Sequence, residues 1–448
     1  MSKETAVVPP DSIREHVDLI REVFMYANRF AGGTFVLHLD SEIVESDALS
    51  GIVKDLVLLR RTGIRVALVP GASSRIDEVL ERYGIASRKV DGVRISSPEA
   101  VPFIKMAAFD VANRVMTLLT AEGENAVIGN WVRARSLGVR DGVDFQDTGF
   151  VEKIKIGLLE NALEQNFIPI FPCVGWNAAG KPYNIGSLEL AEELSSRIGA
   201  DKLFFVSTFN GITSADYDLG GQFETTESGR VPRMDLAEAA MFVEQHRDRS
   251  DDHGVRLVKH GYEAARTGVK RVHIVDGRIE GVLLKEIFSN LGIGTMIHAN
   301  VYQSIRPMTA SDVSEVYRLM QPFVARGILV PRTEEFLEGN YEDFVVYETD
   351  GSLHGCGALH SYSDGQAEIA AIAVDTQYEE LGTGRKVVEF LMQRAAERNV
   401  SRVFALTTQS YDWFHARGFR TGSVEDLPPE KQSRYDRERN SRILLYDL

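Results

Sequence analysis

Residues 367–391, AEIAAIAVDTQYEELGTGRKVVEFL, form the most informative stretch of the sequence. A run of apolar residues predicts a buried strand, and a loop with Gly382 and Gly384 leads from it into a helix. The unpaired N–H groups and the dipole at the start of a helix attract an anion, and glycine lets a phosphate approach the backbone closely. The stretch therefore predicts either a phosphate-binding turn or an ordinary strand-to-helix turn without a ligand.

The sequence on both sides of this stretch predicts one α+β domain over residues 305–448, a length that suits a single domain. Before the stretch, strands alternate with glycine-rich turns from residue 344, as in a strand meander. After it, the sequence predicts a helix over residues 385–399, a strand over 403–408, a short helix over 411–418 and a last strand over 443–448.

Residues 16–298 predict a separate α/β domain. Residues 34–44 (TFVLHLDSEIV) predict its first strand, residues 46–63 a helix and residues 64–71 (IRVALVPG) the next strand. The same rhythm recurs along the domain, which predicts a mainly parallel sheet covered by helices on both faces. We expect residues 1–15 to form a flexible tail and residues 299–304 a linker between the domains.

Composition argues against several functional classes. A net charge of −15 is the opposite of what a nucleic-acid-binding protein normally shows. The two cysteines, Cys173 and Cys356, form neither a metal-ligand spacing nor a disulfide framework, so no metal is expected. The first residues lack the apolar core of a signal peptide, and no apolar stretch is long enough to span a membrane. These features predict a cytoplasmic protein without a membrane or nucleic-acid partner.

The order of elements in the second domain resembles that of the GNAT acyltransferase family. The shared features are the strand meander, the strand–loop–helix unit and a short helix that ends at Arg417-Gly418-Phe419. The resemblance implies a GNAT α+β fold that binds acetyl-CoA, with its pyrophosphate at the start of the helix. The residues that it implies for acetyl-CoA binding are Ile372, Ala373, Val374, Gly382, Thr383, Gly384 and Arg385.

One position departs from the family's phosphate loop. Glu379 stands where the family usually has Gln or Arg. A carboxylate there should weaken phosphate binding unless it points away from the site. Arg385 and Lys386, which follow the loop, can compensate for that charge.

Further local matches narrow the resemblance within the GNAT enzymes. They lie at residues 327–332 (GILVPR), at Glu368, at Leu406-Thr407-Thr408 before Trp413-Phe414, and at Tyr435, Arg439 and Ser441 in the C-terminal tail. Together they resemble the bacterial glutamate N-acetyltransferases, or N-acetylglutamate synthases. This resemblance implies acetyl transfer from acetyl-CoA to the α-amine of L-glutamate, the first step of L-arginine biosynthesis.

The residue types at these positions suit that chemistry. A substrate with two carboxylates needs cations, and arginine can grip a carboxylate through two parallel hydrogen bonds. Arg332 and Arg439 are the predicted substrate-binding arginines, and Lys431 and Ser441 are the further candidates. The alternative for Arg439 is a surface position in a charged tail.

A general base is also needed, because an α-ammonium group is mostly protonated near pH 7. Glu368 is the predicted base, since a carboxylate is unusual in an otherwise apolar strand; the alternative is a solvent-facing strand residue. Many GNAT enzymes protonate the leaving thiolate with a tyrosine at the position of Phe414. Here Thr407, Tyr411 or solvent remains for that role, and Thr407 is the predicted catalytic residue.

The first domain resembles the amino-acid kinase fold of the acetylglutamate kinases, which implies an αβα sandwich. The matches are residues 68–73 (LVPGAS), residues 182–185 (PYNI) and the extended run over residues 268–297. His38 stands where these kinases have a lysine, and Leu188 where they have an acidic residue. Without the lysine little remains to neutralise a transferring phosphoryl group, so we expect no kinase activity.

The same resemblance implies feedback inhibition by L-arginine. Its effector site would join an N-terminal helix, predicted over residues 13–30, to the end of the domain. The matching residues are Tyr26, Phe30, His273, Glu286 and Gly292. A carboxylate such as Glu286 suits a guanidinium, whereas Tyr26 and Phe30 also have the spacing of ordinary helix packing. Relatives assemble this helix into hexamers, so a homo-oligomer is expected.

Other functions remain open from the sequence. One is a GNAT enzyme that acetylates another amine, such as a protein lysine or a different amino acid. Another is an arginine sensor whose acetyltransferase domain has decayed, which Glu379 and Phe414 would favour. A third is an active acetylglutamate kinase with an accessory domain, against which His38 and Leu188 argue.

Overall fold

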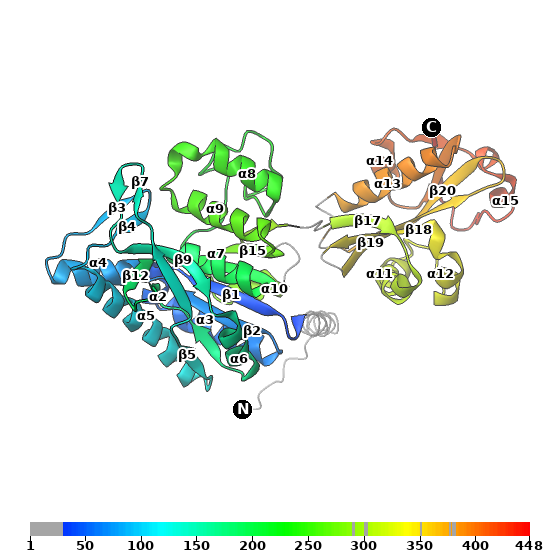
Figure 1. Cartoon of the computed structure of the whole chain (residues 1–448). Helices are drawn as coiled ribbons and strands as arrows, with labels where there is room; N and C mark the ends of the chain where they lie inside the picture. Colours follow the sequence, from blue (N-terminus) through cyan, green and yellow to red (C-terminus); the bar gives the residue numbers. More distant parts are fainter. Residues whose placement is uncertain (1–29, 289–291, 300–302, 350–351, 376–377, 379–381) are drawn as a thin grey trace, which may run out of the picture. The chain divides into compact units, whose positions relative to one another are not determined.

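The computed structural model describes residues 30–288, 292–299, 303–349, 352–375, 378 and 382–448. The chain divides into two compact units, residues 1–300 and 301–448, which Figure 1 colours mainly blue to green and yellow to red. The helix predicted over residues 13–30 lies outside the described residues except for Phe30.

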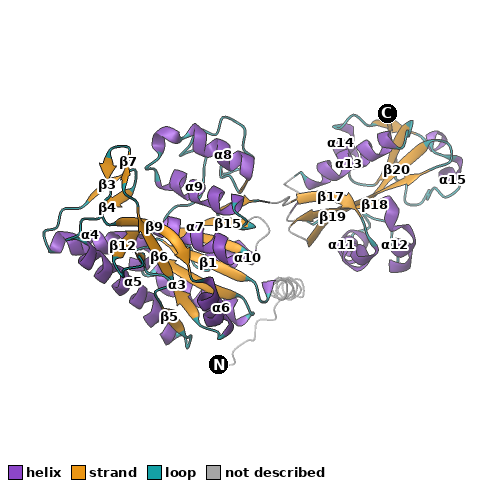
Figure 2. Cartoon of the chain, viewed as in Figure 1, coloured by secondary structure: helices purple, strands orange, loops and turns teal. Residues whose placement is uncertain are grey.

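The first unit is built on an eight-stranded sheet (Figure 2). Its order is β14-β16-β15-β13-β1-β2-β10-β5, and every neighbouring pair is parallel except β15 with β16. The mainly parallel sheet predicted from the sequence is therefore confirmed. Its strands are β1 (Thr34–Leu39), β2 (Arg65–Pro70), β5 (Ala126–Ile128), β10 (Ile168–Ile170), β13 (Lys202–Ser207), β14 (Arg233–Asp235), β15 (Arg271–Asp276) and β16 (Thr295–His298).

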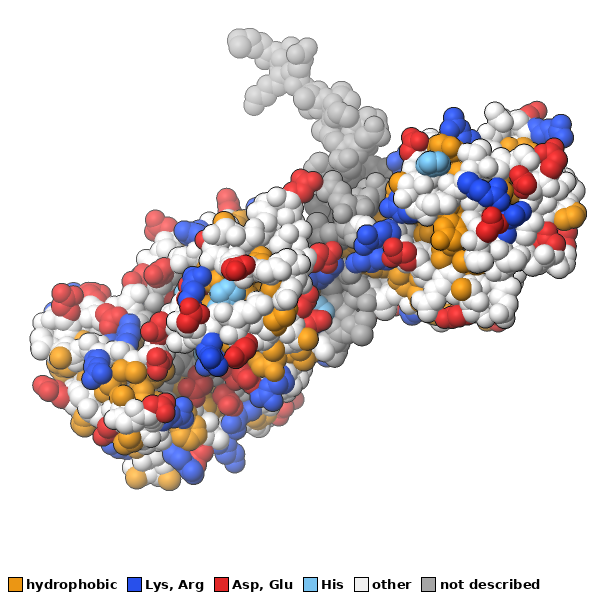
Figure 3. All heavy atoms as spheres, turned by 90° about the horizontal axis from the view of Figure 1, so that it is seen from above, with side chains coloured by type: hydrophobic (Ala, Val, Ile, Leu, Met, Phe, Trp, Pro, Cys, Tyr) orange, Lys and Arg blue, Asp and Glu red, His pale blue; other side chains and the backbone are white. Residues whose placement is uncertain are grey.

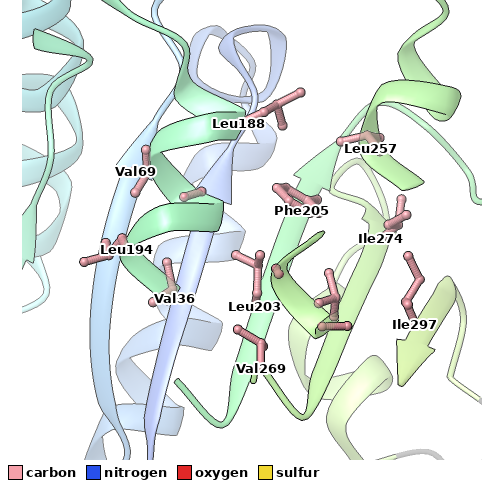
Figure 4. Close-up of a cluster of buried hydrophobic side chains, with 14 of the residues drawn as sticks. Val36, Val69, Leu188, Leu194, Leu203, Phe205, Leu257, Val269, Ile274 and Ile297 are labelled. Carbon is pink, nitrogen blue, oxygen red and sulfur yellow. The ribbon is translucent and has the colours of Figure 1, made fainter. Parts of the chain in front are cut away.

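Helices cover both faces because successive strand residues point to opposite sides of the sheet. In β1, Phe35 and Leu37 enter one buried cluster and Val36 enters the other, part of which Figure 4 shows. The first cluster packs α2 (Ser41–Glu45), α3 (Ala48–Arg61), α4 (Ser73–Arg82), α5 (Val101–Ala121) and α10 (Val282–Phe288). The second packs α6 (Ile156–Glu164), α7 (Ser187–Ile198), α8 (Leu236–Gln245) and α9 (His253–Arg266). The result is the predicted αβα sandwich.

The first strand is shorter than predicted. We expected a strand over residues 34–44, but β1 ends at Leu39 and α2 begins at Ser41. Asp40 causes the change, since its carboxylate accepts a hydrogen bond from the Ser41 backbone N at 2.6 Å and caps the helix. Ile43 and Val44 are therefore buried by a helix, and so short an apolar run does not distinguish helix from strand.

A small barrel and two hairpins of the first unit were not predicted. The hairpin strands have two or three residues, too few to show a period, and the barrel depends on pairing between segments far apart in sequence. The barrel closes in the order β11-β12-β9-β6. Its strands are β6 (Val132–Ser136), β9 (Thr148–Ile154), β11 (Val174–Trp176) and β12 (Pro182–Ile185). The hairpins pair β3 (Arg88–Val90) with β4 (Val93–Ile95) and β7 (Val139–Arg140) with β8 (Val143–Asp144).

The second unit contains one seven-stranded sheet of order β17-β18-β19-β20-β21-β23-β22. Neighbouring strands are antiparallel except β20 with β21. The strands are β17 (Gln303–Pro307), β18 (Phe344–Thr349), β19 (Ser352–Ser361), β20 (Gln366–Val374), β21 (Arg402–Thr407), β22 (Arg420–Gly422) and β23 (Arg442–Asp447). One face packs α13 (Thr383–Glu397) and α14 (Tyr411–His415), the other α11 (Val313–Ala325) and α12 (Glu334–Asn340); α15 (Pro429–Gln432) precedes β23.

The central strand β20 changes its pairing along its length. It pairs with β21 only as far as Ile369 and Ala405, although β20 itself continues to Val374. On its other side, a bulge interrupts the register with β19, and Ala371 adopts a left-handed φ of 54°. A bulge bends the strand that contains it, so β20 and β21 separate in the middle of the sheet.

Candidate active site

Glu368, the third residue of β20, has a buried side chain whose two oxygens are both engaged. Lys431 Nζ lies 2.8 Å from Oε1 and 2.6 Å from Oε2, and Tyr362 Oη donates to Oε2 at 2.9 Å. Only 6% of Glu368 is exposed, so the alternative of a solvent-facing strand residue is wrong. Burial and the neighbouring carboxylate raise the pKa of Tyr362 well above its usual value, and its hydroxyl is a donor at neutral pH.

Two arginines lie near this carboxylate. Arg332 is half-buried in the loop between α11 and α12. Burial lowers the pKa of Arg332, Glu368 acts in the opposite direction, and Arg439 adds to the lowering, so the three charges are close enough to interact. Arg439 Nη2 donates to the carbonyl oxygens of Ile328 at 2.7 Å and Gly327 at 3.3 Å. The C-terminal tail thereby holds the loop that carries Arg332.

The tail itself is fixed by local hydrogen bonds. Tyr435 Oη donates to the backbone oxygen of Ser441 at 2.7 Å, and Ser441 is buried at the start of the last strand. Gln432 Nε2 donates to the Leu427 carbonyl oxygen at 2.8 Å, which anchors the short helix α15 that carries Lys431. These contacts bring the predicted residues Arg332, Lys431, Arg439 and Glu368 into one cluster; their roles in binding and catalysis remain predictions.

The start of α13 is the predicted phosphate-binding turn. Gly382 is the residue before the helix and has a φ of 68°, a left-handed conformation that glycine adopts without strain. Thr383, fully buried in the first turn, has an Oγ1 without a hydrogen-bond partner. Arg385 points out of the same turn and is 3.6 Å from Glu389. Glu379 lies outside the described residues.

Arg417 is a second cation near this turn, and its sequence pattern indicated only the end of a helix. Its guanidinium carbon lies 3.6 Å from the centre of the Trp413 ring, and its Nη1 donates to the Trp413 carbonyl oxygen at 2.6 Å. Its Nε is buried without a partner. Burial and then Arg385 lower the pKa of Arg417, and a side chain at Gly384 would contact Trp413, so these groups converge on the start of α13.

Thr407 ends β21 and caps the next turn. Its Oγ1 accepts hydrogen bonds from the backbone N of Ser410 at 2.8 Å and of Gln409 at 3.2 Å, which leaves its own hydrogen available. Phe414, at the position of the tyrosine of other GNAT enzymes, is buried in the core. Tyr411, the candidate acid besides Thr407, bonds through its hydroxyl to Thr421 Oγ1 at 2.8 Å.

In the first unit, the predicted effector residues within the described part of the chain also lie together. His273 Nδ1 is 2.7 Å from Glu286 Oε1, and the other oxygen of Glu286 accepts from the backbone N of Ile293 at 2.7 Å and of Gly294 at 3.0 Å. A side chain at Gly292 would collide with the Glu286 carboxylate. Tyr26 lies outside the described residues.

Lys202, which sequence reasoning missed, joins this cluster to Phe30. Its Nζ is 3.3 Å from His273 Nε2 and 5.1 Å from the centre of the Phe30 ring. Burial and the charge of Lys202 lower the pKa of His273, so neutral His273 donates through Nδ1 to Glu286 and accepts from Lys202. No local pattern marked this lysine, which is buried at the start of β13.

Comparisons with known proteins agree with both units. Residues 31–276 match the amino acid kinase family, and residues 311–419 match the acetyltransferase (GNAT) family. The amino-acid acetyltransferase of Shewanella oneidensis is 33% identical over 444 residues, covering 97% of this chain and 98% of the relative. The Escherichia coli K12 amino-acid acetyltransferase is 30% identical with the same coverage. The chain belongs to the amino-acid acetyltransferase family.

Solved structures support the same assignment. N-acetylglutamate synthase from Neisseria gonorrhoeae, complexed with coenzyme A and L-arginine, is 29% identical and has a TM-score of 0.82; the match covers 96% of this chain and 99% of that one. The same enzyme complexed with coenzyme A and N-acetyl-glutamate has a TM-score of 0.60 over the same coverage. The kinase-like and GNAT folds predicted from the sequence are confirmed, and this amino-acid acetyltransferase is an acyltransferase enzyme.

The position of the kinase lysine is occupied differently in this acetyltransferase. His38 Nε2 is 2.9 Å from Ser187 Oγ, and burial lowers the pKa of His38 to about 4, so it is neutral at pH 7. Asp40 is 3.0 Å from His253 Nε2; burial opposes its ionisation, but the hydrogen bond from His253 and nearby charges lower its pKa to about 2. Leu188 is buried.

Among the described residues, no group of three or more His, Cys, Asp and Glu side chains could hold a metal ion. None of the helices in this part of the chain is long and apolar enough to cross a membrane. On the face seen in Figure 3, acidic and basic side chains are interspersed over each unit, without the continuous basic stripe of a nucleic-acid-binding surface.

Proposed function

We propose that this acetyltransferase is an N-acetylglutamate synthase, which transfers the acetyl group of acetyl-CoA to the α-amine of L-glutamate and starts L-arginine biosynthesis. The observation that carries the proposal is the buried Glu368 carboxylate among Arg332, Arg439 and Lys431. One base among three cations suits an amine that has two carboxylates of its own. The complex of the Neisseria gonorrhoeae relative with N-acetyl-glutamate supports the same acceptor.

Arg332, Arg439, Lys431 and Ser441 would hold the two carboxylates of the acceptor. The guanidinium of Arg332 is half-buried beside Glu368, where a charge-assisted hydrogen bond is stronger than at an open surface. Arg439 has an indirect part as well, because its bonds to residues 327 and 328 position the Arg332 loop.

Glu368 would remove one proton from the α-ammonium group of glutamate, so that the nitrogen gains a free electron pair. Acetyl-CoA supplies the acetyl group: the new C–N bond forms as the C–S bond breaks, and the amide nitrogen loses a second proton. Backbone N–H groups of residues 372–374, beyond the point where β20 leaves β21, would polarise the thioester carbonyl.

Thr407 would protonate the departing thiolate, because its hydroxyl keeps a free hydrogen while its oxygen accepts two backbone bonds. The second proton lost by nitrogen balances this step, so one proton is released to solvent per turnover. A thiol with a pKa near ~8.5 is a tolerable leaving group, and the contribution of Thr407 is therefore small.

The start of α13 would bind the pyrophosphate of acetyl-CoA. The first-turn N–H groups that follow Gly382 offer donors to an anion. Arg385 and Arg417 add positive charge close by, which offsets an acidic residue in the preceding loop.

A steady-state assay of coenzyme A release tests the proposal. The purified chain is offered acetyl-CoA with L-glutamate, with other amino acids and with lysine peptides. We expect turnover with glutamate well above that with every other amine. Turnover with lysine peptides but not with glutamate would identify a different GNAT enzyme, and L-arginine binding without any acetyl transfer would identify a decayed sensor.

L-arginine is the proposed feedback inhibitor, and the cluster of Phe30, His273, Glu286 and Gly292 is its proposed site, with Tyr26. The Neisseria gonorrhoeae relative was crystallised with L-arginine, which supports this regulation. Glu286 suits the guanidinium, and Lys202 suits the carboxylate of the effector. A homo-oligomer, a hexamer by resemblance, and a cytoplasmic location belong to the same proposal.

The kinase-like unit is proposed to lack kinase activity. A neutral His38 and a buried Leu188 supply neither the positive charge nor the carboxylate that phosphoryl transfer uses. Incubation with ATP and N-acetylglutamate should release no ADP.

A further inference from the structure

The proposed base, Glu368, has hydrogen-bond partners on both of its oxygens. Lys431 Nζ lies within hydrogen-bond distance of both of its oxygens, at 2.8 and 2.6 Å, and Tyr362 Oη occupies a further position at 2.9 Å. The other charged or titratable side chains that face this carboxylate are Arg332, and His360, which is opposite Glu368 on β19 and pairs with Asp343.

This arrangement conflicts with proton removal from a substrate ammonium. A substrate ammonium must reach one of these oxygens to give up its proton, and Lys431 is in contact with both of them. Lys431 would also repel the α-ammonium group of the acceptor as it approaches Glu368. Catalysis therefore requires that the Lys431 ammonium leave Glu368 before the proton is transferred.

Lys431 can leave without disturbing the fold. Its backbone is in α15, where Lys431 N donates to Pro428 O at 2.8 Å and Ser363 Oγ donates to Glu430 Oε1 at 2.9 Å. The side chain is 23% exposed, and its ammonium group sits at the end of a four-carbon stem with rotatable bonds. Tyr362 reaches the same carboxylate from beyond β19 and holds it in place when the lysine moves.

We propose that Lys431 guards the base and that one carboxylate of the acceptor draws it away. In the free enzyme Lys431 pairs with Glu368. When a dicarboxylic amine binds, Arg332 and Arg439 hold one of its carboxylates. Lys431 then leaves Glu368 and pairs with the other carboxylate of the acceptor. Glu368, now held by Tyr362 alone, accepts the proton of the α-ammonium group. This inference rests on the proposed acetylation of glutamate and adds a specificity-determining role for Lys431.

The exchange makes the second carboxylate of the substrate a condition for catalysis. Norvaline has the amine, the α-carboxylate and the chain length of glutamate without its terminal oxygens. It leaves Lys431 on Glu368, so the base stays blocked even when norvaline is bound. The structure thus accounts for selectivity through the reactivity of the base as well as through binding.

The test compares kcat/KM for glutamate and for norvaline in the full-length enzyme and in Lys431→Met. Methionine keeps the length of the side chain but has no charge. We expect kcat/KM for glutamate to fall about tenfold or more, because a charged hydrogen bond to substrate is lost. We expect kcat/KM for norvaline to rise about tenfold, because the base is unblocked. Two changes of opposite sign would not follow from general damage to the site.

Lys431→Arg is the matched control, since it keeps a cation beside Glu368 and should keep norvaline turnover low. A Lys431→Met enzyme in which norvaline turnover is unchanged would contradict the proposal that Lys431 blocks Glu368, and would leave Lys431 as a substrate ligand only. Equal losses for both acceptors would overturn it in favour of a structural role. Absence of glutamate acetylation in the unsubstituted enzyme would instead refute the proposed function.

Discussion

Glu368 combines burial, a tyrosine donor and a lysine partner at one carboxylate, and in the proposed reaction it accepts a proton once Lys431 has moved away. Glu368→Gln keeps the shape but cannot accept the proton. We expect kcat to fall about 10²- to 10⁴-fold, the usual contribution of a general base. Acetyl-CoA affinity, measured by calorimetry, should stay nearly unchanged. A variant with full turnover would remove Glu368 from the role of base.

Arg332 is expected to bind substrate without taking part in proton transfer. Arg332→Ala should raise the glutamate KM about 10- to 100-fold, the loss expected for charged hydrogen bonds, and change kcat less. Arg318→Ala is a suitable control, because Arg318 is exposed on α11 and bonds within its own helix, to Ser314 O. An unaltered glutamate KM in Arg332→Ala would place this guanidinium outside the substrate site.

The beginning of α13 is the element at which acetyl-CoA recognition can be tested. Arg417→Leu removes a guanidinium that is stacked on Trp413 and has an unpartnered Nε. We expect the KM for acetyl-CoA to rise about tenfold while the KM for glutamate is retained. The more exposed Arg385, changed to Leu, should have a smaller effect. Equal acetyl-CoA KM values for the unsubstituted enzyme and Arg417→Leu would contradict this role.

Strand β1 carries a histidine that links stability to pH. His38 has a pKa of about 4 in the folded chain and near ~6.5 when unfolded. Below pH 6.5 His38 takes up a proton in the unfolded chain but stays neutral in the folded chain. The stability that depends on neutral His38 is therefore fully present above pH 6.5 and is lost toward pH 4.

Because of this histidine, the unfolding free energy of the first unit should fall by about 2 kcal/mol between pH 7 and pH 5. His38→Asn removes that contribution. We therefore expect its unfolding free energy to depend less on pH over this interval, as measured by hydrogen exchange of β1 in the full chain. The same pH dependence in both proteins would show that His38 already takes up its proton in the folded state.

Elements with a long periodic pattern could be predicted, and very short ones could not. The strand that contains Glu368 and the helix after Gly382 follow from apolar period and glycine position. The end of β1 at Leu39 was missed, because the Asp40 cap outweighs the apolar run that follows it. The four-stranded barrel depends on pairing between segments far apart in sequence, which local patterns do not contain.

For the enzyme as a whole, the residues proposed for regulation and those proposed for catalysis lie in different units of the chain. Glu286→Gln keeps an acceptor for the Ile293 and Gly294 N–H groups but removes the charge that would attract a guanidinium. We expect the arginine concentration for half-inhibition to rise at least about tenfold, with kcat in the absence of arginine retained. Undiminished inhibition would move the effector site away from this carboxylate.

Much of this enzyme can be understood from the order of its residues. Periodic apolar positions, glycines at turns and the resemblance of short motifs are local properties, and they suffice for the two folds, the reaction class and most of the candidate side chains, though not for Lys202 or Arg417. The contact between Lys431 and Glu368, 63 positions apart, is not a local property. It exists because hydrogen bonds from Gln366 of β20 to Asp426 O and from Ser363 to Glu430 hold the segment of α15 beside β20. Only chain folding brings such distant charges together, and the same holds for Lys202 beside His273.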